Sequence, residues 1–228
     1  MEILSDVNFW IGLMKIIWIN IILSGDNAVV IALAARSLPP HQQKKAIMFG
    51  SGAAVVLRVI LTVVAVQLLQ LSYLQIVGGL LLLYIGVQLL SEGDEEEGHA
   101  KEGGGLMAAV RTILIADIVM SLDNVIAVAA AAKGSNLLLI IGLAISIPLV
   151  IFGSTLMIKL MERFPIIVTL GAALIGWVGG ETIVSDVSLK ATLESAPWLH
   201  YAAAAVGAVF VVLLGRFLQK RHAESAPA

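Results

Sequence analysis

S-G-D-N at residues 24–27 and S-L-D-N at residues 121–124 are two polar motifs inside stretches that are otherwise almost purely apolar. The alignment that sets Asp26 over Asp123 extends beyond the motifs and pairs Ile21 with Ile118, Ala32 with Ala129 and Arg36 with Lys133. An internal repeat of this kind decides the architecture, because each copy forms one structural unit. The sequence therefore predicts two equivalent halves, each carrying a carboxylate and a carboxamide in an apolar segment.

The composition is that of an integral membrane protein. Of the 228 residues, 59% are hydrophobic and 13% are charged, and the mean hydropathy is +0.99. Soluble domains are about half apolar and about a quarter charged. A net charge of −2 without a long basic cluster disfavours nucleic-acid binding, and the absence of cysteine excludes disulfides and thiolate metal sites. The lipid bilayer is therefore the expected environment.

Seven stretches are long enough to span a bilayer, which takes about 20 mainly apolar residues. They are residues 10–35, 46–69, 72–90, 106–132, 137–158, 164–185 and 198–216. Lys and Arg gather in alternate loops, which predicts an external N-terminus and a cytoplasmic C-terminus. The first residues carry no basic segment of a secretory signal, so the first apolar run is expected to remain as a spanning helix. These features predict a multi-pass protein of the plasma membrane.

An acidic, Gly-rich connection at residues 91–105 divides the two halves. It has too few apolar residues to order itself and reads as a flexible cytoplasmic linker, or alternatively as a cation-sensing segment that uses His99. Three helices per half is an odd number, so the second copy must be inverted, as in many secondary transporters. The predicted fold is an all-α bundle with a 3+3 inverted repeat plus one C-terminal helix. Its units are residues 1–90, the linker 91–105, residues 106–185, and the seventh helix and tail at 186–228.

Helical spacing places the polar side chains in stripes, because residues three and four apart share a face. One stripe contains Asn20, Ser24 and Asn27, and the other contains Asp117, Ser121 and Asn124. Asp26 and Asp123 lie about 6 Å from the middle of their helices, toward opposite membrane faces. If Asp26 is to join its stripe, the helix needs a break near Gly25, and such a break is tolerated where backbone lines a cavity.

Buried aspartates point to a functional site, because each disfavours membrane insertion by about 2.5–3.5 kcal/mol. Clustered carboxylate, amide and hydroxyl oxygens suit hard divalent cations such as Mn²⁺, Mg²⁺ or Ca²⁺. The predicted metal ligands are Asp26, Asn27, Asp117, Asp123 and Asn124, with Asn20, Ser24, Ser121, Arg58 and Glu181 as supporting residues. The sequence leaves open whether the aspartates form one shared site or two successive sites. A structural alternative is that Asp26 and Asp123 only pair with Arg58 or cap broken helices.

Arg58 lies at the middle of the second predicted span and requires a counter-ion there. A carboxylate is the natural partner, either in a permanent structural pair or in one that an arriving cation releases. Glu181 could serve as a gate or proton relay, or it could extend toward the membrane interface. The glycines of the spans at 72–90 and 164–185 are expected to be close-packing positions.

The paired motifs S-G-D-N-A-V-V-I-A-L-A-A-R and D-I-V-M-S-L-D-N-V-I-A-V-A-A-A resemble those of the TerC family of integral membrane proteins, and in particular its bacterial YjbE-like branch of metal transporters. The resemblance covers residues 10–218. It implies metal-ion efflux or homeostasis, chiefly of manganese, and kinship with LysE-like exporters. Carried over by motif, it implies that Asp26, Asn27, Asp117, Asp123 and Asn124 bind the ion, so Mn²⁺ is the expected substrate and no resident cofactor is expected.

Two other functions compete with metal export. An exporter of amino acids or similar solutes would need Arg58 to face the cavity beside the aspartates. An intramembrane aspartyl protease would need two carboxyls sharing one proton, whereas Asp26 and Asp123 are displaced to opposite sides, so we expect no enzyme. The chain also lacks a phosphate-binding Gly-Lys-Ser/Thr loop, which argues against ATP-driven transport. The sequence leaves open the coupling ion and the oligomeric state, including a homo-oligomer.

Overall fold

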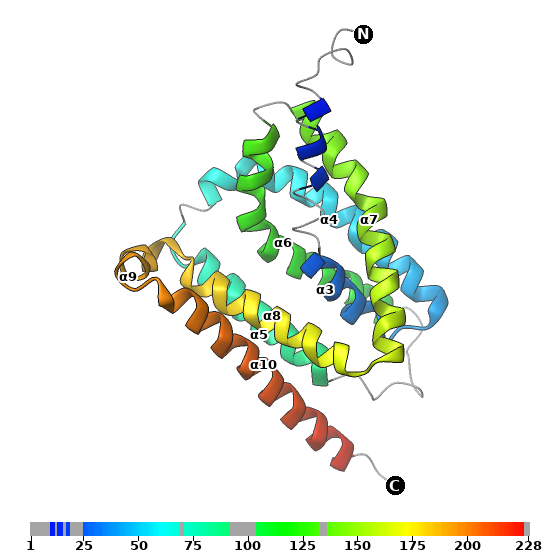
Figure 1. The fold of residues 1–228 in the computed structure, drawn as a ribbon. Coiled ribbons are helices and arrows are strands. Elements are labelled where there is room, and N and C mark those ends of the chain that lie inside the picture. The colour runs from blue at the N-terminus through cyan, green and yellow to red at the C-terminus, as the bar shows by residue number, and fades with distance from the viewer. Residues whose placement is uncertain are drawn as a thin grey trace.

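A computed structural model of the chain describes residues 10–11, 13–15, 17–18, 25–68, 71–91, 104–132 and 136–225. Asn20, Ser24 and the side chain of Asp123 lie outside this description. The described part is helical and contains no strand. Its elements are α3 (Gly25–Ala35), α4 (Pro40–Leu68), α5 (Leu74–Ser91), α6 (Gly104–Ala132), α7 (Asn136–Arg163), α8 (Ile166–Val184), η1 (Val187–Leu189), α9 (Lys190–Ser195) and α10 (Trp198–Ser225). Figure 1 shows their arrangement.

Prolines set several of the helix boundaries. Pro40 is the first residue of α4. Its fixed φ suits this position, and the N–H that proline lacks would have no acceptor within the helix there. Pro165 stands directly before α8 and separates it from α7, because the residue before a proline is disfavoured in the helical region. Ser91 closes α5 and Gly104 opens α6, while residues 92–103 of the predicted linker lie outside the described residues.

Among the described residues, five helices are long and apolar enough to cross a membrane. They are Leu74–Ser91, Gly105–Leu122, Ile140–Arg163, Ile166–Val184 and Trp198–Arg221. Large apolar side chains such as Phe152 and Leu213 are 70% and 65% exposed, as expected for surfaces that face lipid tails. The all-helical membrane fold is therefore confirmed. The count of seven spans and the orientation of the termini stay predictions, since most of the first predicted span lies outside the described residues.

Helices α5, α8 and α10 pack against one another as one group (Figure 1). Glycines allow their backbones to touch: a Cβ on Gly79 of α5 would collide with the carbonyl of Gly179, and one on Gly180 would collide with the carbonyl of Ala203 in α10. Small residues at such crossings bring helices close enough for extensive van der Waals contact in a membrane. This confirms the expectation that the glycines of these spans are close-packing positions.

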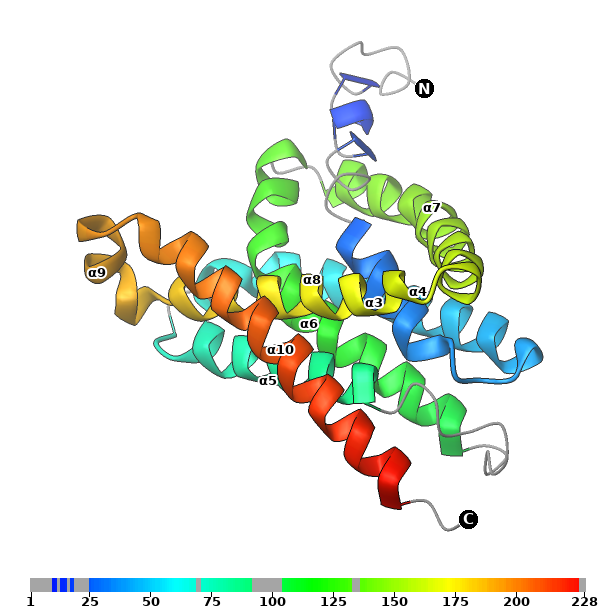
Figure 2. The same ribbon diagram turned by 60° about the horizontal axis from the view of Figure 1, so that its bottom comes forward.

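Helices α3, α4, α6 and α7 form the other group, in which α4 packs along α6 and α3 lies against α6 and α7. The two groups meet where α3 contacts α8 and where α6 contacts α5. Figure 2 shows α3 beside α8, with α9 at the end of the α5–α8–α10 group that is remote from the C-terminus. Helix α3 of the first predicted half thus contacts α8 of the second, and α6 of the second predicted half contacts α5 of the first.

Close contacts also fix the relative directions of neighbouring helices. Gly50 of α4 contacts Ile113 of α6, and further along both helices Arg58 binds Ser121, so α4 and α6 run parallel. By the same reasoning α8 and α10 are antiparallel, since Gly176 contacts Gly207 and Gly180 contacts Ala203. These directions are the ones expected if successive helices cross the membrane in alternating directions. The inverted relation of the two halves stays a prediction.

Candidate functional site

A charged group lies buried between α4 and α6. The Nη2 of Arg58 donates to Oδ1 of Asp117 in an ion pair, and Arg58 Nε donates to the hydroxyl of Ser121 across 2.9 Å. That hydroxyl in turn donates to Oδ2 of Asp117 at 3.2 Å. Arg58, Asp117 and Ser121 are 5%, 6% and 0% exposed. The three side chains therefore form a closed ring of hydrogen bonds, which we call the Arg58 ring.

The position of the Arg58 ring follows from regular helix geometry. Asp117 and Ser121 are one turn apart on α6, and residues at this spacing lie on one face. Their hydrogen bond shows that they share the face that meets α4. Asn124, three residues further along α6, is partly buried. The carboxylate partner that Arg58 requires is thus Asp117. The sequence did not single it out among the three aspartates of the predicted spans, Asp26, Asp117 and Asp123.

Asp26 belongs to the same region. It lies in the first turn of α3, which begins at Gly25 and contacts both α4 and α6. Its carboxylate accepts the N–H of Asn27 at 2.8 Å and interacts electrostatically with Arg58 and with Asp117. The positive end of the α3 dipole also favours a carboxylate at this position. The structure therefore brings Asp26 into electrostatic range of the Arg58 ring, and Asn27 beside it is 3% exposed.

The donor atoms at this place are oxygens of the kind that bind hard cations. Within the described residues, no three side chains of His, Cys, Asp or Glu group so that they could hold a metal ion. The region offers the two carboxylates of Asp26 and Asp117, and hydroxyl and amide oxygens would have to complete a coordination shell. Ca²⁺ and Mg²⁺ sites are commonly built from such mixed oxygen ligands and water. The oxygens present are therefore of the types that such cations bind.

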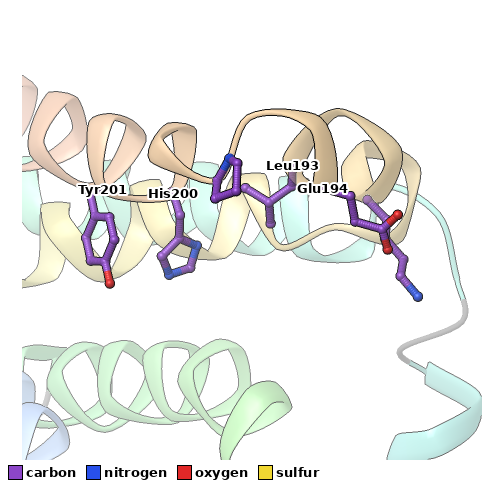
Figure 3. Close-up of a pocket in the computed structure, with 6 residues that line it drawn as sticks. Leu193, Glu194, His200 and Tyr201 are labelled. Carbon is purple, nitrogen blue, oxygen red and sulfur yellow. The ribbon is translucent and has the colours of Figure 1, made fainter.

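Glu181 of α8 is engaged elsewhere. Its Oε1 lies 2.7 Å from Nε2 of His200 on α10, and both side chains are about one-third exposed, at 35% and 31%. His200 lines a pocket formed with Lys190, Leu193, Glu194, Pro197 and Tyr201, at the turn from α9 into α10 (Figure 3). Glu181 thus pairs with His200 inside the α5–α8–α10 group. Among the described contacts, none joins Glu181 to the Arg58 ring.

Asp186 holds two parts of the fold together, a role that the sequence analysis did not predict. It is fully buried and accepts the N–H groups of Tyr73, Gln75 and Ile76 at 3.0, 3.1 and 3.4 Å. It also accepts the N–H and the hydroxyl of Ser188 at 2.9 and 2.6 Å. Burial raises the pKa of Asp186, but the hydrogen bonds from Ser188, Tyr73 and Ile76 outweigh it and lower the pKa to about 2. The signal in the sequence was Asp186 itself, because Asp is a favoured N-cap residue whose side chain accepts an N–H two or three residues further on, here that of Ser188.

Comparison with known proteins identifies the family to which the chain belongs. Residues 5–223 match the family described as "Integral membrane protein TerC family". The chain is 42% identical over 213 residues to the uncharacterized membrane protein YjbE of Bacillus subtilis (strain 168), covering 93% of this chain and 97% of YjbE. No solved structure matches the chain.

Longer proteins share parts of the sequence. YkoY of Bacillus subtilis (strain 168), another uncharacterized membrane protein, is 28% identical over 189 residues, or 75% of this chain and 58% of YkoY. The UPF0053 inner membrane protein YoaE of Escherichia coli (strain K12) is 33% identical over 145 residues, or 55% of this chain and 28% of YoaE. Nearly the whole chain is therefore covered by one family and by one relative of similar length. The protein is a multi-pass integral membrane protein that belongs to the TerC family.

Proposed function

We propose that the protein is a secondary transporter that exports divalent metal cations, with Mn²⁺ as its principal substrate, across the plasma membrane. The observation that carries this proposal is the buried pair of Arg58 and Asp117 between α4 and α6, with the half-buried Asp26 in the first turn of α3 within electrostatic range of both. Membership of the TerC family supports a transporter in place of an enzyme. The resemblance of the two Asp-Asn motifs to that family favours manganese over the other hard cations.

The energetic cost of this group argues against a purely structural role. A charged residue at the centre of a spanning helix disfavours insertion by about 2.5–3.5 kcal/mol. Neutral Ser, Thr or Asn side chains supply interhelical hydrogen bonds without this cost, and intramembrane ionisable residues mark ion pathways by default. We infer that Asp26 and Asp117 contribute carboxylates to the transported ion, together with Asn27, Asp123 and Asn124. In this proposal α3 and α6, the matching helices of the two halves, supply the ligands.

The decisive experiment is Mn²⁺ transport by purified protein in liposomes that enclose a metal-sensitive dye, with and without a pH gradient. We expect Asp26→Asn to abolish Mn²⁺ transport, because the amide keeps the shape of the carboxylate but carries no charge. Glu162→Gln is the matched control, since it removes a carboxylate from an exposed position of α7 and should transport normally. Equal transport by Asp26→Asn and the wild type at equal reconstitution would reject the proposal.

Export of an amino acid or a similar zwitterion is the second candidate. The observation in its favour is that Arg58 pairs with the carboxylate of Asp117 and interacts electrostatically with that of Asp26, so that groups of both signs are available to a zwitterion. Competition decides between the two candidates: amino acids should leave Mn²⁺ transport unchanged if the metal is the substrate. Inhibition of Mn²⁺ transport by millimolar amino acids, together with their own uptake, would favour the organic solute.

A further inference from the structure

We infer that Arg58 acts as an internal counter-cation of the transport site, which leaves Asp117 when the metal binds and returns to it when the metal departs. This inference rests on the proposed function, because it assigns a role to Arg58 during transport of a divalent cation. Arg58 would then be a positioning and specificity residue and not a metal ligand. Its guanidinium would hold the empty site closed in place of the substrate.

The first support is that Arg58 and a metal ion would use the same acceptors. Oδ1 and Oδ2 of Asp117 and Oγ of Ser121 all take part in the Arg58 ring. A hard cation binds through such carboxylate oxygens, and a like-charged guanidinium cannot share them with it in a buried place. The ion pair as it stands therefore excludes a metal from Asp117.

The second support is the balance of charge. Among the described side chains, the carboxylates of Asp26 and Asp117 oppose the one guanidinium of Arg58. A divalent cation at Asp117 would lie beside that guanidinium, and two like charges repel each other strongly in a buried place. Binding of the metal therefore favours the departure of Arg58.

The third support is the location of the partners on different helices. Arg58 is carried by α4, whereas Asp117 and Ser121 are carried by α6. The Arg58 ring joins α4 to α6, and exchange of Arg58 for a metal would break this connection. The alternative of a permanent structural pair predicts the opposite behaviour, because Arg58 would stay bound to Asp117 during transport.

Arg58→Gln and Arg58→Lys test the exchange through Mn²⁺ affinity, measured by titration calorimetry of protein in nanodiscs. We expect Arg58→Gln to bind Mn²⁺ on the order of tenfold more tightly, since close charge pairs contribute at least about that factor to affinity, and to transport it more slowly because release is impaired. Arg58→Lys keeps the charge and should bind Mn²⁺ with nearly wild-type affinity. Folded Arg58→Gln that binds Mn²⁺ no more tightly than the wild type would overturn the inference.

A measurement on the wild type keeps the inference testable if Arg58→Gln does not fold. We expect Mn²⁺ to increase the modification of Arg58 by phenylglyoxal, read by peptide mass spectrometry, because the guanidinium leaves its buried partners. Arg216 on the exposed part of α10 is the internal control and should react equally with and without Mn²⁺. Unchanged or reduced modification of Arg58 in protein that demonstrably binds Mn²⁺ would refute the exchange. Wild-type protein that neither binds nor transports Mn²⁺ would instead refute the proposed function.

Discussion

The main-chain N–H of Tyr73 donates a hydrogen bond of 3.0 Å to Oδ1 of Asp186, although 113 residues separate the two in the sequence. The same carboxylate accepts the main-chain N–H groups of Gln75 and Ile76 at the start of α5 and of Ser188 in η1. Asp186 therefore caps α5 from the loop that follows α8. Because α5 and α8 also touch through Gly79 and Gly179, this end of the α5–α8–α10 group is fixed by both packing and hydrogen bonds.

Acid should weaken the contribution of Asp186 to stability. Its pKa in the folded protein is about 2, below the ordinary value of 3.8, so the ionised carboxylate stabilises the fold. This stabilisation is complete above about pH 4 and is lost as the pH falls through about 2. Asp186→Asn should be less stable than the wild type near neutral pH, and the difference in unfolding free energy should shrink between about pH 4 and 2. Thermal unfolding in detergent over this range checks it, and a difference that is constant with pH would contradict the assignment.

Tyr73 adopts a left-handed backbone conformation with φ of 71°, in which a side chain is disfavoured. The left-handed region costs a non-glycine residue about 1–2 kcal/mol, and the Tyr73 side chain is 64% exposed. We expect Tyr73→Gly to be more stable than Tyr73→Ala by about 1 kcal/mol, because both remove the ring but only glycine relieves the strain. Unfolding by denaturant measures the difference, and equal stability of the two variants would show that this backbone is not strained.

Gly180 should not tolerate even a methyl group. A Cβ at this position would collide with the carbonyl of Ala203 and would force α8 and α10 apart. Overpacking of this kind costs about 1–3 kcal/mol, so Gly180→Ala should lower the unfolding temperature. Gly52→Ala on α4 is the matched control, because no atom lies within 4 Å of its added Cβ and alanine favours a helix over glycine by about 1 kcal/mol. A Gly180→Ala protein as stable as Gly52→Ala would mean that the crossing is looser than described.

The Arg58–Asp117 pair should show strong coupling between its two members. Removing one partner of a buried pair costs about 3–5 kcal/mol, because the other charge is left uncompensated. We therefore expect the double variant Arg58→Gln/Asp117→Asn to be more stable than Arg58→Gln alone. The free energies of unfolding of the two single variants and the double variant form the test. Additive losses would show that the two side chains do not interact in the folded protein.

The sequence predicted α5 and α8 closely because their signals are local. The predicted spans at 72–90 and 164–185 agree with α5 and α8 to within two residues at each end. Prolines and long apolar runs provide such signals without knowledge of the partners. The short elements η1 and α9 were missed, because they follow a loop and are too short to give a periodic pattern.

The sequence by itself determined that the chain is an all-helical membrane protein, that its polar motifs repeat, and that Arg58 requires a carboxylate. Tertiary structure alone decided that the carboxylate is Asp117, that Asp26 lies within electrostatic range of both, and that Asp186 caps α5. Membrane helices that are apolar all round give no pattern that tells one face from another. Which face meets which neighbour is fixed by long-range contacts, such as those of Gly79 with Gly179 and Arg58 with Ser121.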